Sequence, residues 1–256
     1  MLKKPPLLPL LLAVAVTAQL SCVGRTSTGT DSSASRSPNE QAKIDEILQR
    51  YEEAIGGKEA VDAIKNVRMK GTFALPGISG TIEGWGKEDP RKSLLILEFP
   101  RLGTLKKGFD GETHWVQTPA GTFTDSNPRQ IAEMDRDAQA FSAARIRSHF
   151  ESMKLENKAR LSGRDVYMIE GKPAKGPAEK LFFDVENGLL LRWDMARRQQ
   201  ERRTVFVKVH LDDYTQVGAV KIPLKFRLAF EQFNLIYKID EIEHNIPMDD
   251  AMFRKP

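Results

Sequence analysis

Hydrophobic positions along the chain repeat with two different periods, and the change between them falls near residue 65. Apolar residues from Ile44 to Ile55 recur at spacings of three and four, the stripe of an amphipathic helix. Gly56-Gly57 predicts the end of this helix, and residues 58–65 predict a second, short helix. From Val67 onward, apolar and polar residues alternate with a period of two, which predicts strands.

Strand-like segments follow one another over most of the remaining chain. We expect about eleven of them, separated by turn signals such as Pro76-Gly77, Asp110-Gly111 and Asn187-Gly188. Residues 93–99 are apolar at both sets of alternating positions, so we expect this strand to be covered on both faces.

Residues 128–152 interrupt the strand pattern. Ile131 to Phe141 fit one helix and Ile146 to Met153 fit a second, and the stretch is too long and too periodic for a plain loop. A long antiparallel meander must curl to hide its apolar face. The sequence therefore predicts a mainly β, α+β fold. About eleven antiparallel strands form an incomplete half β-barrel, covered by the N-terminal helix and this central helical lid.

Composition narrows the class of protein. The 256 residues hold 39 Lys and Arg against 35 Asp and Glu, a net charge of +4, which is far from the basic excess of nucleic-acid-binding domains. Cys22 is the single cysteine, so the chain forms no internal disulfide and its fold depends on apolar packing.

The N-terminus reads as an export signal. Lys3 and Lys4 precede an apolar stretch over residues 7–18, too short to span a bilayer, and Leu20-Ser21-Cys22 follows where a peptidase would cut. These last three residues resemble the lipobox of bacterial lipoproteins, which implies that Cys22 is lipidated and becomes the new N-terminus. Gln19 departs from the leucine usual in that box, so an ordinary signal peptide with an incidental cysteine is the alternative.

We therefore divide the chain into three parts. Residues 1–21 are the signal peptide. Residues 22–40 are the lipidated cysteine with a polar Gly/Ser-rich tether, which behaves as a coil with a reach of roughly 25 Å. Residues 41–256 form one domain.

No catalytic constellation stands out. The sequence lacks a G-x-S-x-G elbow, an H-E-x-x-H pair and a phosphate loop, and the four histidines lack metal-ligand spacing. The nearest grouping is His210 with Asp212, which reads as a solvated strand end. We expect no enzymatic activity, no metal and no cofactor.

Large apolar residues in the expected strands are candidates for binding. Such residues usually belong to the hydrophobic core. In a sheet that wraps a cavity they can instead line that cavity, where their side chains suit an acyl chain. The candidate lining is Phe73, Trp85, Leu97, Trp115, Phe183 and Trp193.

The densest basic run lies between two expected strands. Arg197, Arg198, Arg202 and Arg203 are candidates for contact with anionic headgroups or an acidic partner, because arginine binds phosphate through two hydrogen bonds. The alternative is a charged hairpin tip without a binding role.

Three segments carry a resemblance to a known family. Residues 108–115, 183–192 and 213–223 look like the LolA-like, outer-membrane lipoprotein-sorting group of bacterial envelope proteins, which includes LolB-like carriers, and the resemblance covers most of residues 41–256. It implies an incomplete antiparallel β-barrel closed by helices. It also implies an apolar cavity for the acyl chains of lipoproteins or lipids, without cofactor or covalent chemistry.

These observations together predict a membrane-anchored periplasmic protein that holds acyl chains in an apolar cavity, for lipoprotein localisation or lipid transport. Val23 stands where an aspartate would favour retention, so the sorting rule of diderm bacteria implies the outer membrane. The alternative is a non-enzymatic envelope interaction or sensor module, whose half-barrel is a platform for a protein partner. Neither function involves nucleic acid.

Overall fold

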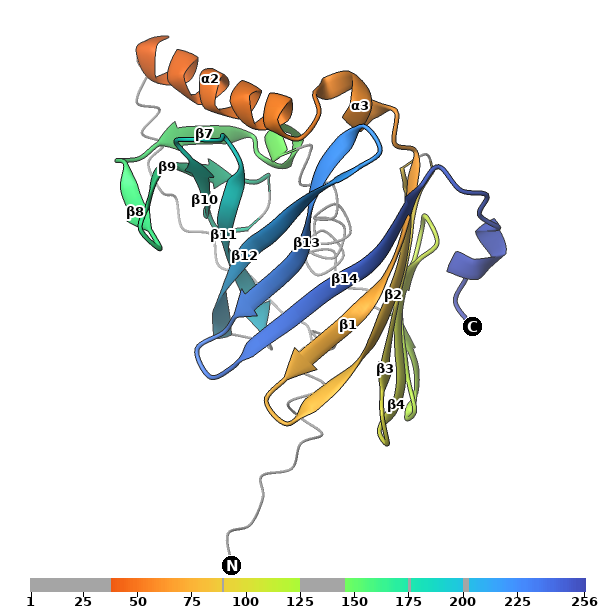
Figure 1. Cartoon of the computed structure of the whole chain (residues 1–256). Coiled ribbons are helices and arrows are strands. Elements are labelled where there is room, and N and C mark those ends of the chain that lie inside the picture. The colour runs from red at the N-terminus through yellow and green to blue at the C-terminus, as the bar shows by residue number, and fades with distance from the viewer. Residues whose placement is uncertain (1–37, 89, 125–145, 175, 200–202) are drawn as a thin grey trace, which may run out of the picture.

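A single antiparallel sheet dominates the protein, shown as a computed structural model in Figure 1. The structure describes residues 38–88, 90–124, 146–174, 176–199 and 203–256. Two helices, α2 (Pro38–Ala54) and α3 (Lys58–Asp62), precede the sheet, and a 3-10 helix, η3 (Asp250–Phe253), follows it. Within the described residues the strands are β1 (Asn66–Leu75), β2 (Ile78–Glu88), β3 (Arg91–Phe99), β4 (Gly103–Phe109), β5 (His114–Thr118), β6 (Gly121–Thr124), β7 (Ser152–Leu155), β8 (Ala159–Leu161), β9 (Arg164–Lys172), β10 (Glu179–Asp184), β11 (Leu190–Gln199), β12 (Arg203–Val217), β13 (Val220–Ala229) and β14 (Asn234–His244).

The mainly β half-barrel predicted from the sequence is confirmed, with 14 strands in the described part of the chain in place of about eleven. The three additional strands are β6, β7 and β8, each three or four residues long. A period of two is hard to recognise over so few residues, which explains why the alternation pattern missed them.

The described residues include only the second of the two helices predicted for the central lid. Its first helix, Ile131 to Phe141, lies outside the described residues. The prediction of the second helix, Ile146 to Met153, is wrong. Residues 146–149 form a single 3-10 turn, and Met153 belongs to strand β7. Met153 pairs with Gly171 of β9, so pairing at the sheet edge outweighs the helical spacing.

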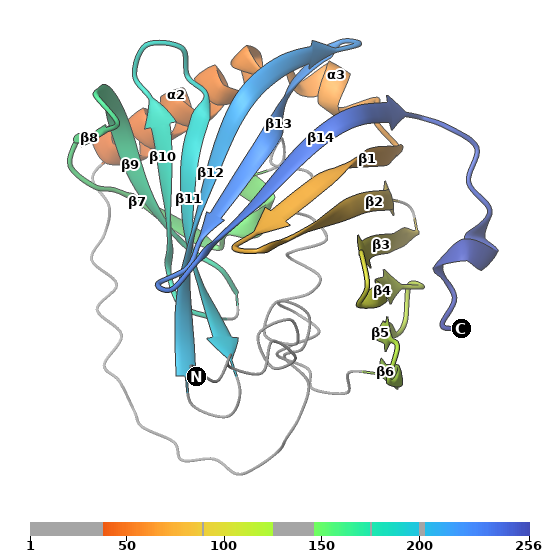
Figure 2. The same ribbon diagram turned by 60° about the horizontal axis from the view of Figure 1, so that its bottom comes forward.

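The two ends of the chain meet in the middle of the sheet. The strand order is β6-β5-β4-β3-β2-β1-β14-β13-β12-β11-β10-β9-β7, with β8 paired to β9, and every described pair is antiparallel. The edges β6 and β7 are not joined, so the sheet curls into an open half-barrel (Figure 2). Helices α2 and α3 lie across one end of it.

The junction between β1 and β14 requires a glycine. The strands pair from Val67 opposite His244 to Ala74 opposite Ile236, with a bulge between Lys70 and Gly71. A Cβ atom at Gly71 would collide with the backbone carbonyl of Lys238 and lie 2.9 Å from the Cα of Ile239. Only a residue without a side chain therefore lets the two strands approach this closely.

Helix α2 forms where the 3.6-residue pattern predicts it. Its buried stripe faces the sheet, and the ring of Tyr51 meets the edge of Phe183 with 5.4 Å between centroids. Gly56 and Gly57 end it with φ of 119° and 85°, values that favour glycine. The backbone N–H of Lys221 then donates to the carbonyl of Ile55 at 2.8 Å, which fixes the helix end to β13.

The junction between the first and last strands leads to a stability prediction. Gly71→Ala should lower the free energy of unfolding in urea by about 1–3 kcal/mol, because the backbone of β14 must move away. Gly86→Ala is the matched control in the neighbouring strand, since its new methyl would lie 3.7 Å from Val67 Cγ1, an ordinary contact. Equal stability of the two variants would contradict the assigned close approach.

Candidate functional site

One face of the sheet carries a continuous apolar row, which we call the inner face. The register places Leu181 opposite Trp193, Trp193 opposite Val209, and Val209 opposite Leu228. Leu228 in turn lies opposite Leu235 of β14. Residues directly opposite each other in antiparallel strands project to the same side, so these five side chains form one surface across five strands.

Helix α2 covers only part of this inner face. Its side chains pack with those of β9–β12 in a buried group that we call the helix-covered cluster, together with Val61 of α3. Both Phe183 and Trp193 belong to it and are buried. This half of the inner face is therefore core of the ordinary kind, filled by the protein's own side chains.

The other half of the inner face is built from strands alone. Its buried members, which we call the strand-only cluster, all come from β1–β4 and β14, and no described helix contributes to it. Half-buried hydrophobic residues from β13, β14 and their turn, Phe226 and Tyr237 among them, pack against it. The buried members are Met69, Phe73, Ile82, Leu97, Phe99, Leu105, Leu235 and Ile239.

Glycines in β2 give the large side chains of this cluster room to lie flat on the sheet. A Cβ at Gly80 would come within 2.7 Å of the Phe73 ring, and one at Gly84 would come within 2.6 Å of Met69 Cε. The Phe73 ring in turn meets Phe99 at 4.7 Å between centroids. Burial raises the pKa of the Tyr237 hydroxyl, as expected for apolar surroundings. The result is a broad apolar wall.

The structure divides the six candidate lining residues into three pairs. Phe73 and Leu97 lie in the strand-only cluster, and Phe183 and Trp193 lie in the helix-covered cluster, all on the inner face. Trp85 and Trp115 lie on the opposite, outer face with Leu94 and Phe253. The structure therefore does not bring these two tryptophans together with the other four residues.

The outer tryptophans hold the C-terminal segment. The indole N–H of Trp115 donates to the carbonyl of Phe253 at 2.9 Å, and the Phe253 side chain is 0% exposed. Lys87 and Lys92 each donate to the carboxylate of Asp250 at 2.8 Å. Strand β3 is consequently covered by this segment on its outer face, where Leu94 packs with Trp115 and Phe253, whereas Leu97 on its inner face belongs to the strand-only cluster.

A buried polar group accompanies Trp193 on the inner face. Its indole N–H donates to the Glu179 carboxylate at 2.7 Å, and the His149 ring meets its edge at 5.7 Å. Both Glu179 and His149 are buried. The polar edge of this tryptophan is thus engaged by the protein, which fixes the orientation of the ring.

The basic run lies in the hairpin where the sequence predicts it. The backbone register pairs Arg197 with Val205 and Arg198 with Thr204, at the ends of β11 and β12, and Arg203 begins β12. The side chains of these arginines, Arg202 and the predicted lipidation site Cys22 lie outside the described part of the protein.

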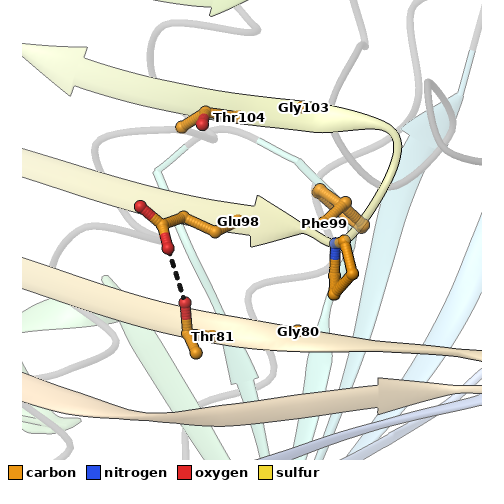
Figure 3. A pocket seen from close by; sticks show the side chains of 7 residues that line it. Gly80, Thr81, Glu98, Phe99, Gly103 and Thr104 are labelled. Atoms are coloured by element: carbon orange, nitrogen blue, oxygen red, sulfur yellow. Dashed lines mark hydrogen bonds between the residues drawn. The ribbon is translucent and has the colours of Figure 1, made fainter.

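A depression at the ends of β2, β3 and β4 has a volume of about 320 Å³ (Figure 3). Thr81 and Glu98 project into it, and the Thr81 hydroxyl donates to the carboxylate at 3.1 Å. Its remaining lining includes Phe99 and the small residues Gly80 and Gly103. This small, open hollow contains the Glu98 carboxylate and does not suit a long alkyl chain, so we place the candidate site on the strand-only cluster.

His210 lies within β12, opposite Arg192 of β11 and Arg227 of β13, and not at a solvated strand end as its sequence predicts. Burial and the neighbouring Arg227 and Arg192 lower its pKa to about 4, so the imidazole is neutral at pH 7. Across the described ranges, no three His, Cys, Asp or Glu side chains gather as a metal site. No helix within those ranges is long and apolar enough to cross a membrane.

Solved structures share this fold. A DUF1329 family protein from Desulfovibrio piger is 14% identical, with a TM-score of 0.57 over 82% of this chain and 97% of that one. A putative outer membrane lipoprotein-sorting protein domain from Vibrio parahaemolyticus is 11% identical, with a TM-score of 0.55 over 84% and 96%. A LolA superfamily protein from Nitrosomonas europaea is 11% identical, with a TM-score of 0.56 over 82% and 97%.

This chain therefore shares its open antiparallel half-barrel with these three proteins. The protein has the LolA-like fold, which confirms the resemblance noted in its sequence at the level of the fold. No family model and no curated protein matches the sequence.

Sequence reasoning missed the contribution of β13 and β14 to the apolar wall. Leu228, Leu235 and Tyr237 pack in or against the strand-only cluster, although none was a candidate. The signal was present, since apolar residues alternate from Val220 to Phe230. Period-two alternation marks one face of these strands as apolar. The candidates were selected mainly for large aromatic side chains, which favoured the tryptophans over Leu228 and Leu235.

Attachment of the C-terminal segment predicts a pH effect. Hydrogen bonds from Lys87 and Lys92 lower the pKa of Asp250 from its ordinary value of 3.8 to about 2. Because the folded-state value is depressed, this contribution to stability is present above about pH 4 and is lost as the pH falls toward 2.

Asp250→Asn should therefore flatten the fall in thermal stability across this acidic range, relative to the wild-type protein. Asp249→Asn is the control, since Asp249 caps η3 by accepting from the Ala251 N–H, whereas both lysines donate to Asp250. The same slope in wild type and Asp250→Asn would contradict the assignment.

Proposed function

We propose that the protein binds the acyl chains of lipids or lipoproteins on the strand-only cluster and acts as a non-enzymatic carrier or acceptor in the bacterial cell envelope. The observation that carries this proposal is the composition of that half of the inner face. It is apolar across β1–β4 and β13–β14, several of its hydrophobic side chains are half-buried, and no described helix packs on it. A partly exposed apolar face of this extent is typical of a binding surface.

Burial of alkyl chain alone can supply the affinity. Each buried CH₂ contributes about 0.8 kcal/mol, so about ten of them give roughly 8 kcal/mol, the range of micromolar binding. The wall that Phe73, Leu97 and Leu235 help to form offers apolar contact without a fixed polar partner. Such a surface selects the alkyl chain and leaves the headgroup unspecified.

The N-terminal sequence supports a place in the envelope. Residues 1–21 would export the protein. The lipidated Cys22 and the tether to residue 40 would then hold the domain of residues 41–256 close to a membrane. Val23 favours the outer membrane, facing the periplasm. The name of the Vibrio neighbour, a putative outer membrane lipoprotein-sorting protein domain, agrees with this assignment.

The first test is direct identification of ligand. Protein purified from membranes under native conditions should carry lipid or free fatty acid that native mass spectrometry detects. Protein that is fully folded yet free of lipid, and that does not take up a fluorescent fatty acid, would contradict the proposal.

A substitution on the wall gives a sharper test. Leu228→Gln places an amide on the inner face, where an alkyl chain cannot satisfy it, and should weaken binding of cis-parinaric acid about tenfold. Ile236→Gln is the matched control, because Ile236 is also half-buried but lies opposite Arg227, on the outer face. Thermal unfolding confirms that both variants fold, and equal affinities would place the ligand elsewhere.

A further inference from the structure

One charged side chain interrupts an apolar row on the inner face of the sheet. The register aligns one residue from each of β1–β6 in this row, namely Met69, Gly84, Leu95, Lys107, Val116 and Phe123. Five of them are apolar or glycine, and the charged one is Lys107 of β4. The lysine therefore has apolar neighbours directly opposite it on both β3 and β5.

The neighbours of Lys107 fix the side of the sheet to which it projects. Leu95, directly opposite on β3, packs against the strand-only cluster of the inner face. The next residue, Gly108, lies under the ring of Trp115 on the outer face, where a Cβ atom would collide with that ring. Because successive side chains of a strand point to opposite faces, Lys107 projects inward.

This part of the inner face is accessible to a ligand. Leu95, Lys107 and Val116 are half-buried, and Phe123 at the sheet edge is 45% exposed. Figure 2 shows that β4, β5 and β6 carry the curve of the sheet on from β3. The row thus extends the apolar wall of the strand-only cluster toward the β6 edge and adds a positive charge to it.

The polarity of the inner face changes at Lys107. Toward the β3–β4 turn, the next pair along the two strands is Leu97 and Leu105, both buried members of the strand-only cluster. In the other direction the next pair is Ser93 and Phe109, which adds a hydroxyl group. The face is therefore apolar on one side of the lysine and mixed on the other, and an amphiphile has the same division along its length.

The lysine side chain suits both parts of such a ligand. Its methylene stem can lie along an alkyl chain, while its ammonium group donates to an anion. An ammonium group beside apolar side chains is only partly hydrated, so a ligand carboxylate or phosphate stabilises it more strongly than in water. Lys107 also has an interaction within the protein. Because the ammonium group carries three N–H donors, it can bind a ligand oxygen alongside that partner.

We propose that Lys107 binds the anionic headgroup of the acyl ligand, so that the preferred ligand is an amphiphile with a carboxylate or a phosphate. This inference rests on the proposed function and narrows its ligand class. The alkyl chain would extend from Lys107 over Leu97 and Leu105 into the strand-only cluster. An acyl anchor without an anionic group would lack the contact, so a free fatty acid or a phospholipid is favoured over the acyl anchor of a lipoprotein.

Competition among three ligands of equal chain length tests the proposal. The neutral fluorophore N-phenylnaphthylamine reports occupancy of the apolar face. Oleate, oleyl phosphate and oleyl alcohol are added to displace it at about pH 8, where both acidic ligands are ionised. At least one anion should bind about tenfold more tightly than the alcohol, because hydrogen bonds to charged groups are stronger than those between neutral groups. Tighter binding of oleate would indicate a fatty acid, and tighter binding of oleyl phosphate would indicate a phospholipid.

Substitution of the lysine separates charge from packing. Lys107→Met keeps an unbranched apolar side chain without the ammonium group. It should weaken binding of the preferred anion about tenfold and change binding of oleyl alcohol by less than about twofold. Lys107→Arg should retain most of the preference for an anion, because it restores the positive charge.

Lys106→Met is the matched control. Lys106 is also half-buried and lies on the same strand, but it is opposite Ile96, on the outer face. The control should leave the affinities for anion and alcohol within about twofold of the wild-type values, the spread expected for surface changes away from the contact. Thermal unfolding confirms that each variant is folded.

Three results would overturn the proposal. The first is equal affinity of the wild-type protein for oleyl alcohol and both anions. The second is an equal loss of anion binding in Lys107→Met and Lys106→Met, which would indicate a general effect of charge. The third is an equal loss of anion and alcohol binding in Lys107→Met, which would show that the lysine acts through packing.

Failure of this inference is distinguishable from failure of the proposed function. Displacement of the fluorophore without any preference for an anion would contradict the role of Lys107 alone. Failure of all three ligands to bind would contradict acyl binding itself, and the inference with it. Leu228→Gln should weaken all three ligands alike and leave their ratios unchanged, because it alters the wall and not the headgroup contact.

Discussion

The pairing of β1 with β14 is the constraint on which the rest of the structure depends. Without it the chain would form two separate meanders, β1–β6 and β7–β14, each with an apolar face and two free edges. The bulge beside Gly71 lets the two strands meet, and the inner faces of the two meanders become one surface. Because the outermost strands β6 and β7 do not pair, this surface is curved and open.

Helix α2 then divides that surface unequally. The helix is 17 residues long and meets the sheet over β7 and β9–β12, where Tyr51, Phe183 and Trp193 are buried. The strands from β1 to β4, with β13 and β14, keep an apolar wall without a described helix against it. The same sheet thus supplies a conventional core at one end and a candidate binding face at the other. On the outer face, the C-terminal segment lies over β2, β3 and β5.

Much of this fold could be predicted from the sequence, because period-two alternation, Asn187-Gly188 and Gly56-Gly57 are local signals with local causes. The extent of the sheet could not, since β6, β7 and β8 are held by their neighbours and have little pattern of their own. The division of the candidate site was also beyond the sequence. Alternation separates the two faces of a strand but does not say which face turns inward. Trp115 and Trp193 have similar surroundings in the sequence. In the structure, Trp115 donates to the Phe253 carbonyl on the outer face, whereas Trp193 packs with α2 on the inner face.

Photo-cross-linking with a diazirine-labelled fatty acid tests the central claim most directly. The claim predicts that peptide mapping by mass spectrometry finds label on inner-face residues of β1, β3, β13 and β14, with Leu228, Leu235 and Tyr237 among them. Label confined to the outer face, or to residues beneath α2, would contradict it. So would the absence of specific label from protein shown to be folded.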